Sequence, residues 1–261
     1  MNIWILGFGW LAAYIHQEAK ALNAKIAAVT RDSNKVEDLK KMGLSPILVN
    51  QGEHFIPDYI PFLPDVVVMC TPPSKDPESY SIWCTYFLGI HSSLQHAGCE
   101  PMWIYTGSTG IYPDESGLFD EMYSVSVSNA RQIYLVMHEQ VLQSQVGDKL
   151  CIARLGGLIG GERNAVRFYH HQADRFHALE PVNMIHGKDA AHFILHAAQK
   201  QLRGIYNVCH PDHPTREVFY QKACLQNGIE PNEMNHKGAF KNRIISSDKM
   251  ILSSFHPMIN I

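Results

Sequence analysis

Short apolar runs alternate with longer amphipathic segments over most of the chain. The run that begins at Ile3 and the runs at residues 25–29, 47–50, 65–70, 102–106, 150–155 and 204–208 predict strands. Most of these runs lack a polar face, as is typical of parallel strands that are buried on both sides. Apolar residues at helical spacing predict a helix after the first strand and further helices at residues 34–42, 78–97, 128–145, 189–199 and 215–226.

The order of these elements predicts the fold class. Strands and helices alternate from the start of the chain, which indicates an α/β protein with a doubly wound parallel sheet, the Rossmann architecture. Gly43, Gly98 and Gly147 each follow a predicted helix, where a helix C-terminus commonly takes a residue of positive φ. We expect residues 1–160 to form this core, and residues 161–261 to form a smaller C-terminal substrate lobe with elements that return to the core.

The turn after the first strand carries a glycine motif, Gly7-x-Gly9-x-x-Ala12. Gly7 allows a tight turn, Gly9 lets the main chain approach a diphosphate, and Ala12 permits close packing of helix on strand. The helix N-terminus that follows offers N–H groups and the positive end of a dipole to phosphates. The motif therefore predicts a dinucleotide site, and the alternative is a strand-turn-helix corner without a ligand. The predicted cofactor contacts of this turn are Gly7, Phe8, Gly9, Trp10 and Leu11.

The composition of the chain bears on the class of ligand and on the cellular location of the protein. The chain has 261 residues, of which 18% are charged and 46% hydrophobic, with a formal net charge of -3. This balance favours neither a nucleic-acid surface nor a disordered chain, so we expect a small-molecule substrate. We also expect a cytoplasmic protein, because no apolar run approaches the roughly 18 residues of a membrane span and no secretory leader precedes the first strand. The six cysteines form no C-x-x-C pair, which argues for reduced thiols.

The residues after the second strand bear on the choice between NAD and NADP. Thr30 and Arg31 follow this strand, and Lys35 stands one helical turn later. An arginine in this place can pair with the 2′-phosphate of NADP, whereas a carboxylate would accept from the 2′-hydroxyl of NAD. Asp32 could be such a carboxylate or could cap the next helix. We therefore expect Thr30 and Arg31 to contact NADP and keep NAD as an alternative.

Four further segments resemble one enzyme family. Residues 105–112 read Tyr-Thr-Gly-Ser-Thr-Gly-Ile-Tyr, and Thr-Pro-Pro stands at 71–73. Arg-Leu-Gly-Gly-Leu-Ile-Gly follows at 154–160, and Asn-Met-Ile-His-Gly-Lys-Asp-Ala-Ala at 183–191. In this order, after the glycine motif, they resemble the extended short-chain dehydrogenases/reductases of the epimerase/dehydratase group. The resemblance covers nearly the whole chain and identifies it as similar to an atypical branch of that family.

The resemblance implies a catalytic site with one defect. The family places a Ser or Thr four residues before an aromatic residue, which here are Ser108 and Tyr112. It also uses a Tyr-x-x-x-Lys pair on the helix after the fifth strand, usually with a glutamate four residues later. With Glu139 as that glutamate, Arg131 takes the tyrosine position and Leu135 the lysine position. In another register Tyr134 stands opposite His138, again without a lysine. The candidate catalytic residues are Ser108, Tyr112 and Arg131.

The resemblance implies an NAD(P)-dependent oxidoreductase or epimerase/dehydratase acting on a small polar metabolite, with a nucleotide sugar as one candidate. Thr71 and Pro72 would line the adenosine-ribose side of the cofactor, and Gly157 would lie near the nicotinamide. The alternative is a non-catalytic NADP sensor or regulatory protein. The sequence leaves open whether the helices after the fourth and fifth strands form the homodimer interface that is common in this family.

Fifteen histidines raise the question of a metal site. His192 and His196 are four residues apart on a predicted helix, but the glutamate of the zincin motif is missing. His170 and His171, with His177 nearby, form a second group without a carboxylate to complete a site. We expect no metal. His186, inside the last family-like segment, is expected to organise structure rather than to perform chemistry.

Overall fold

The computed structural model describes residues 1–49, 60–166 and 176–261. The chain forms two compact units, each assembled from separate stretches of sequence. The first unit comprises residues 1–107, 127–153 and 191–205, and the second comprises residues 108–126, 154–190 and 206–261. The sequence predicted a core of residues 1–160 and a smaller lobe of residues 161–261 with elements that return to the core. In the structure residues 191–205 belong to the first unit, and residues 108–126 and 154–160 belong to the second.

A seven-stranded sheet underlies the first unit, in the order β3-β2-β1-β4-β5-β7-β10. The strands are β1 (Asn2–Leu6), β2 (Lys25–Thr30), β3 (Ser45–Leu48), β4 (Val66–Met69), β5 (Met102–Ser108), β7 (Leu150–Leu155) and β10 (Gly204–Val208). The neighbouring strands from β3 to β5 pair in parallel. The strand order reverses at β1, because the chain runs outward through β2 and β3 and then returns to β4 on the other side. This order confirms the predicted doubly wound fold.

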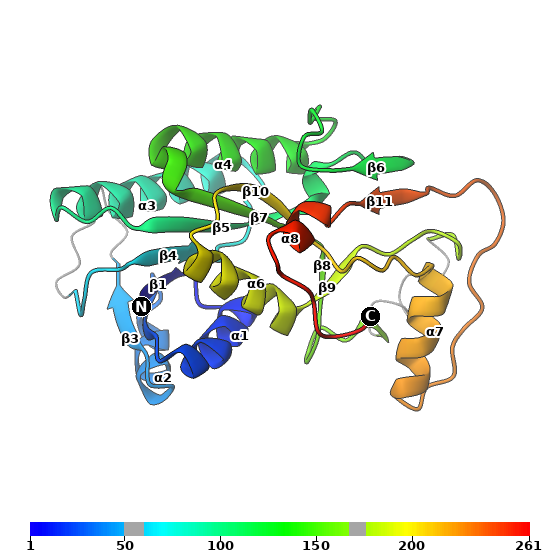
Figure 1. The fold of residues 1–261 in the computed structure, drawn as a ribbon, viewed down its shortest axis with the longest axis horizontal. Coiled ribbons are helices and arrows are strands. Elements are labelled where there is room, and N and C mark those ends of the chain that lie inside the picture. Colours follow the sequence, from blue (N-terminus) through cyan, green and yellow to red (C-terminus); the bar gives the residue numbers. More distant parts are fainter. Residues whose placement is uncertain (50–59, 167–175) are drawn as a thin grey trace. The chain divides into compact units, whose positions relative to one another are not determined.

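Helices cover both faces of this sheet (Figure 1). The helices α3 (Pro77–His96) and α4 (Ala130–Val146) lie on one face, and α1 (Trp10–Ala19) and α6 (Gly187–Lys200) lie on the other. Side chains of β1 alternate between the faces, and Trp4 and Leu6 join the core under α3, where Trp83 and Phe87 pack. Both faces of the strand are thus buried, which explains why its sequence has no polar side.

Local sequence signals set the ends of several helices. α3 begins after Asp76, whose carboxylate accepts from the Ser79 N–H at 2.7 Å, and Pro77 is its first residue. Gly43, Gly98 and Gly147 have φ values of 81°, 66° and 62°, as predicted for residues that end helices. The predicted helix at 34–42 is shorter in the structure, where a 3-10 turn (Ser33–Lys35) precedes α2 (Val36–Lys41).

The second unit has a smaller core and two short sheets. Its strand β6 (Gly117–Phe119) pairs in parallel with β11 (Arg243–Ile245), and β8 (Gly157–Ile159) pairs in parallel with β9 (Met184–His186). Its helices include α7 (Arg216–Gln226) and α8 (Asp248–Leu252). The apolar runs of the sequence did not predict these four short strands. No helix among the described residues of either unit is both long and apolar enough for a membrane span.

A buried histidine joins α3, α4 and β5 in the first unit. His138 has no exposed surface, and its two ring nitrogens lie 3.0 Å from Ser74 Oγ and 3.0 Å from Tyr105 Oη. Its ring stacks on Trp83, with 4.0 Å between ring centroids. Burial lowers the pKa of His138 from 6.5 to about 4, because the charged imidazolium loses its hydration there. The ring is therefore neutral at pH 7.

This histidine predicts a pH dependence of stability. Between pH 6.5 and 4 the unfolded chain binds a proton at His138 that the native state does not bind. The stabilisation is complete above pH 6.5 and is lost as the pH falls, by up to about 3 kcal/mol. We expect His138→Gln to reduce the slope of the unfolding free energy against pH by nearly the amount that one bound proton contributes. Urea denaturation between pH 7 and 4.5 measures this slope. Equal slopes for the two proteins would contradict the assignment.

Candidate functional site

The glycine turn lies where the strand order reverses, at the carboxyl ends of β1 and β4. Gly7 follows β1 with φ of +85°, and its N–H donates to the Val29 carbonyl at 3.2 Å. A Cβ at this position would lie 3.1 Å from Thr71 Cγ2 and 3.3 Å from the Thr71 nitrogen. Both the left-handed φ and the close neighbour therefore require glycine. In open α/β sheets this crevice is where ligands bind.

The missing side chain of Gly9 leaves an open space at the N-terminus of α1, which we call the cradle. Gly9 stands at the N-cap of the helix, where no side chain accepts a hydrogen bond from the first turn. A Cβ built on Gly9 would meet no other atom within 4 Å. Ala12, by contrast, is completely buried and brings the helix close to the sheet. The turn thus offers open space and the positive end of a helix dipole, and both fit a diphosphate.

The other residues of the turn anchor and flank it. Leu11 is buried, whereas Phe8 and Trp10 are half-buried. The Trp10 ring packs edge-on against Tyr14 with 4.8 Å between centroids. These aromatic side chains shape the surface around the cradle.

Arg31 follows β2 and is exposed. Its guanidinium carbon lies 5.6 Å from the centre of the Tyr86 ring, within the range of a cation–π contact. Asp32 caps the next turn, since its carboxylate accepts from the Asn34 N–H at 3.0 Å. Thr30 Oγ1 accepts from the Asp32 N–H at 3.1 Å. The carboxylate therefore has the capping role that the sequence offered as one of two for Asp32.

The segment after β4 is tied to α3. Thr71 Oγ1 accepts from the indole N–H of Trp83 at 3.0 Å, and Pro72 next to it is exposed. The Thr106 hydroxyl, near the end of β5, donates to the Met69 carbonyl at 2.9 Å. Thr71 therefore lies beside the glycine turn, on a segment that contacts from Trp83 and Thr106 hold in place.

Ser108 ends β5 in the second unit. Its Oγ accepts from the Gly110 N–H at 3.1 Å and caps the short helix η3 (Thr109–Ile111). The Thr109 hydroxyl donates to the Leu155 carbonyl at 3.2 Å. Ser108 is half-buried, so it has exposed surface as well as a structural bond. The cap fixes the orientation of the hydroxyl oxygen.

Tyr112 is engaged by two buried polar side chains. Its hydroxyl donates to Asn207 Oδ1 at 2.8 Å and accepts from the Arg154 guanidinium at 2.8 Å. Burial raises the pKa of Tyr112 above its ordinary value, and the Arg154 charge opposes this only in part. A proton donor at neutral pH needs a shift in the other direction. These contacts suit a packing role.

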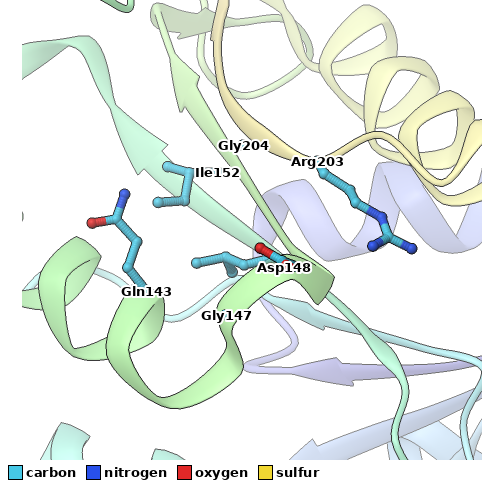
Figure 2. A pocket seen from close by; sticks show the side chains of 7 residues that line it. Gln143, Gly147, Asp148, Ile152, Arg203 and Gly204 are labelled. Atoms are coloured by element: carbon cyan, nitrogen blue, oxygen red, sulfur yellow. The ribbon is translucent and has the colours of Figure 1, made fainter.

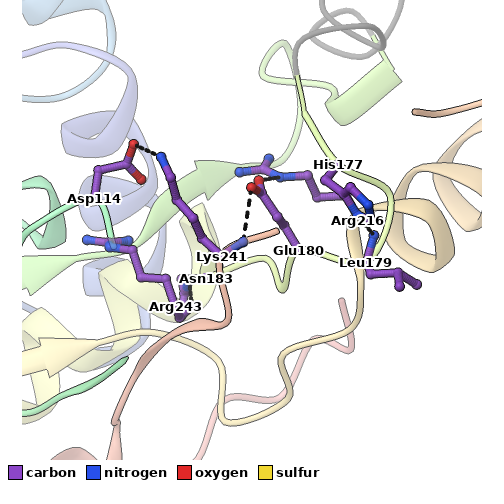
Figure 3. A network of polar contacts seen from close by, with 8 residues as sticks. All are labelled: Asp114, His177, Leu179, Glu180, Asn183, Arg216, Lys241 and Arg243. Carbon is purple, nitrogen blue, oxygen red and sulfur yellow. Dashed lines mark hydrogen bonds and ion pairs between the residues drawn. The ribbon is translucent and has the colours of Figure 1, made fainter. Parts of the chain in front are cut away.

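A polar network spans the second unit (Figure 3). Lys241 pairs with Asp114 at 2.6 Å, and Arg216 pairs with Glu180 at 3.1 Å. Arg243 donates to the Pro113 carbonyl at 2.7 Å and to the Thr109 carbonyl at 2.8 Å. Arg243 thereby holds both ends of the loop after Ser108, although it lies 130 residues beyond Pro113 in the sequence. No local sequence signal predicted this contact.

The helix α4 carries Arg131 and Leu135, which the sequence resemblance sets at the family's tyrosine and lysine positions. Arg131 is exposed near the start of the helix, and Leu135 is buried with 2% of its surface accessible. In the alternative register, Tyr134 packs near Tyr80 and His138 forms the buried contacts described above. Neither Leu135 nor the neutral His138 supplies a cation for a nicotinamide ribose.

Residues 183–191, the last segment that resembles the family, make contacts that hold the fold together. Asp189 is completely buried, and its two carboxylate oxygens accept from the N–H groups of Met258 and Ile259, both at 3.0 Å. Asn183 binds the main chain of Arg243 and Ile245. Gly157 opposes Met184 across β8 and β9, and a Cβ there would overlap the Met184 sulfur.

Histidines serve several different contacts. His192 lies 2.6 Å from Glu18 and joins α6 to α1. Across residues 1–49, 60–166 and 176–261, no group of three metal-binding side chains could hold an ion. His170 and His171 lie outside the described residues.

A separate hollow in the first unit lies at the opposite edge of the sheet (Figure 2). It is lined by Gln143, Gly147, Asp148, Leu150, Ile152, Arg203 and Gly204. Leu150 and Gly204 begin β7 and β10, so the hollow is at the amino ends of the strands. Arg203 extends away from Gln143 in this view. The hollow therefore does not belong to the crevice beside Gly7.

Comparison with known proteins identifies the fold. No protein-family model matches the chain. Protein YeeZ of Escherichia coli strain K12 is 27% identical over 257 residues, which cover 94% of this chain and 91% of YeeZ. The structure of UDP-N-acetylglucosamine 4-epimerase from Bacillus cereus has a TM-score of 0.76 at 15% identity, covering 100% of this chain and 95% of that one. The human epimerase family protein SDR39U1, solved with NADPH, has a TM-score of 0.75 at 14% identity, with coverages of 99% and 95%.

These likenesses extend over whole chains. This chain shares the fold of these two epimerase structures, which agrees with the doubly wound α/β fold that the sequence predicted. The sequence motifs and the structural likeness agree on the architecture.

Proposed function

We propose that this chain binds NADP, with NAD as the alternative, and acts as an oxidoreductase or epimerase on a small polar metabolite. The observation that carries the proposal is the open cradle at Gly9, beside a left-handed Gly7 at the reversal point of the sheet. The bound nicotinamide would supply hydride transfer. The main chain of residues 7–11 would hold its diphosphate, and Arg31 its 2′-phosphate.

The likeness to SDR39U1, which was solved with NADPH, supports the same cofactor. The likeness to a UDP-N-acetylglucosamine epimerase favours a sugar nucleotide among the candidate substrates. Ser108 is proposed to hydrogen-bond the reacting oxygen, and Arg131 to supply charge or a proton in place of the family's tyrosine. Tyr112 is proposed to hold the loop after Ser108 in place, because its hydroxyl is hydrogen-bonded to Arg154 and Asn207.

A second candidate is a dinucleotide sensor that does not turn its cofactor over. The buried Leu135 favours it, since this position is where the family places its lysine. Both candidates require the same cofactor cradle. They differ only in whether a bound dinucleotide changes its redox state.

The cradle is tested by placing a carboxylate in it. Gly9→Asp has room to fold, because nothing lies within 4 Å of the new Cβ, and its charge would repel the diphosphate. We expect NADPH affinity, measured by fluorescence titration, to fall at least about a hundredfold. Ala13→Asp, an exposed change of the same charge on the same helix, is the matched control and should bind nearly normally. Equal binding by the two variants would exclude the cradle as the diphosphate site.

The cofactor preference is tested at Arg31. Arg31→Ala should weaken NADPH about tenfold or more and NADH by less than about twofold, because only NADPH carries the 2′-phosphate. Isothermal titration of both cofactors measures the difference. Arg203→Ala removes another exposed arginine of the first unit, at the opposite edge of the sheet, and serves as the control. Equal losses for NADPH and NADH would remove the basis for the preference.

Turnover is tested with NADPH or NADP and a panel of sugar nucleotides, keto acids and aldehydes. For any active pair, Ser108→Ala should lower kcat about a hundredfold with little change in cofactor affinity, as expected for loss of a donor to the reacting oxygen. Arg131→Ala should also lower kcat, whereas Ser81→Ala, an exposed change on α3, should not. Unchanged rates in both active-site variants would refute this placement of the chemistry. Binding without turnover across the panel would favour the sensor.

A further inference from the structure

A cavity of about 500 Å³ lies in the first unit at the amino ends of the strands. Lys25 and Ser45, which begin β2 and β3, belong to its lining, and so do Pro61 and Phe62, which precede β4. The glycine turn follows the carboxyl end of β1, so the cavity and the cradle lie at opposite ends of a parallel sheet. None of the proposed cofactor or catalytic residues lines the cavity. Its volume is that of a site for a small organic molecule.

One part of the lining is apolar. The side chains of Pro61 and Phe62 are half-buried, and that of Met42 is exposed. The indole N–H of Trp4 donates to the Phe62 carbonyl at 3.0 Å, which ties this wall to the buried core. A ligand that covers Met42 and Phe62 would remove apolar surface from water, which is favourable. The cavity therefore suits a ligand with an apolar body.

Two ammonium groups border the same cavity. Lys20 and Lys25 are exposed, and no aspartate or glutamate stands among the described residues that line the cavity. Within residues 1–49, 60–166 and 176–261, neither ammonium has a hydrogen bond or an ion pair. An anion in the cavity would thus interact favourably with both charges and displace no existing partner.

The ends of two helices oppose these charges only in part. α1 ends at Ala19 and α2 ends at Lys41, and the negative end of a helix dipole corresponds to roughly half an elementary charge. The two ammonium charges therefore exceed the two dipole charges. Carbonyls at these ends also have partners already, since Ala19 accepts from the Ala24 N–H and Lys40 from the Gly43 N–H. The balance favours an anion.

His16 is a buried polar residue of the lining. Burial lowers its pKa, the charge of Lys20 lowers it further, and the hydrogen bond to Met42 opposes both effects. The ring is mostly neutral at pH 7, and Nε2, 3.1 Å from the Met42 carbonyl oxygen, carries its proton. Nδ1 is then a buried acceptor that has no hydrogen-bond partner within the described part of the chain. Such an atom favours a donor group in the cavity.

We propose that this cavity binds an organic anion, in which a carboxylate or phosphate head group is joined to an apolar body about the size of an aromatic ring. Lys20 and Lys25 bind the head group, and Met42 and Phe62 cover the apolar body. The cavity shares no residue with the dinucleotide cradle. The proposal therefore does not depend on the proposed function.

The test is a titration of the full ¹⁵N-labelled chain with sodium benzoate, at pH 7 and at constant ionic strength kept with sodium chloride. We expect saturable shifts of the backbone amides of Lys25, Gly43 and Ser45, with millimolar affinity or tighter. Acetate lacks the apolar body and benzyl alcohol lacks the charge, so each should bind at least about tenfold more weakly. A parallel titration with phenyl phosphate distinguishes a carboxylate from a phosphate as the preferred head group.

Variants of the two lysines test the charge. Lys20→Gln and Lys25→Gln should each weaken benzoate binding about fivefold, and the double variant about twentyfold, with little change for benzyl alcohol. Both side chains are exposed, so these variants keep the core intact. Lys200→Gln removes an exposed lysine of the same unit outside the cavity and should weaken benzoate binding less than about twofold.

Gly9→Asp should leave benzoate affinity unchanged, which separates this site from the dinucleotide cradle. A failure of NADPH binding would leave the benzoate result standing. Shifts that do not saturate, shifts centred elsewhere, equal affinity for benzoate and benzyl alcohol, or equal benzoate affinity in the double variant and Lys200→Gln would overturn the proposal.

Discussion

The close approach of Gly7 to Thr71 is the contact on which the first unit depends. A side chain at Gly7 would lie within 3.1 Å of Thr71 Cγ2, so only glycine lets the two strand ends stand side by side. Thr71 in turn accepts a hydrogen bond from Trp83, and Trp83 stacks on His138. A chain of direct contacts therefore links the turn to α3 and α4. The turn, its open N-cap at Gly9 and the helices behind it form one packed arrangement.

In the second unit, hydrogen bonds from polar side chains, and not a close approach at a glycine, hold the loop after Ser108. Polar side chains from distant parts of the sequence hold the loop: the buried Arg154 binds the Tyr112 hydroxyl, and the half-buried Arg243 binds two main-chain carbonyls. A charge removed from water is stable only when it is well hydrogen-bonded, so these contacts fix the positions of the groups that they join. These contacts give the Ser108 hydroxyl a defined place. The chemistry proposed for Ser108 depends on that rigidity.

Much of the fold could be predicted from the sequence, because its signals are local. The apolar runs and the glycine turn depend on neighbours only a few residues apart, and together they predicted the doubly wound α/β fold. Contacts between distant segments could not be predicted in this way. Tyr86 beneath Arg31, the grip of Arg243 on the loop and the pairing of β6 with β11 have no local pattern. The role of Asp32 stayed open for a different reason, since a cap and a ribose acceptor require the same residue type.

The most direct measurement of the central claim is the structure of this chain in complex with NADPH. The account predicts diphosphate oxygens within hydrogen-bonding distance of the main-chain N–H groups of residues 8–11, in the space that the missing side chain of Gly9 leaves open. A complex in which the diphosphate lies elsewhere, or in which side chains fill that space, would contradict it.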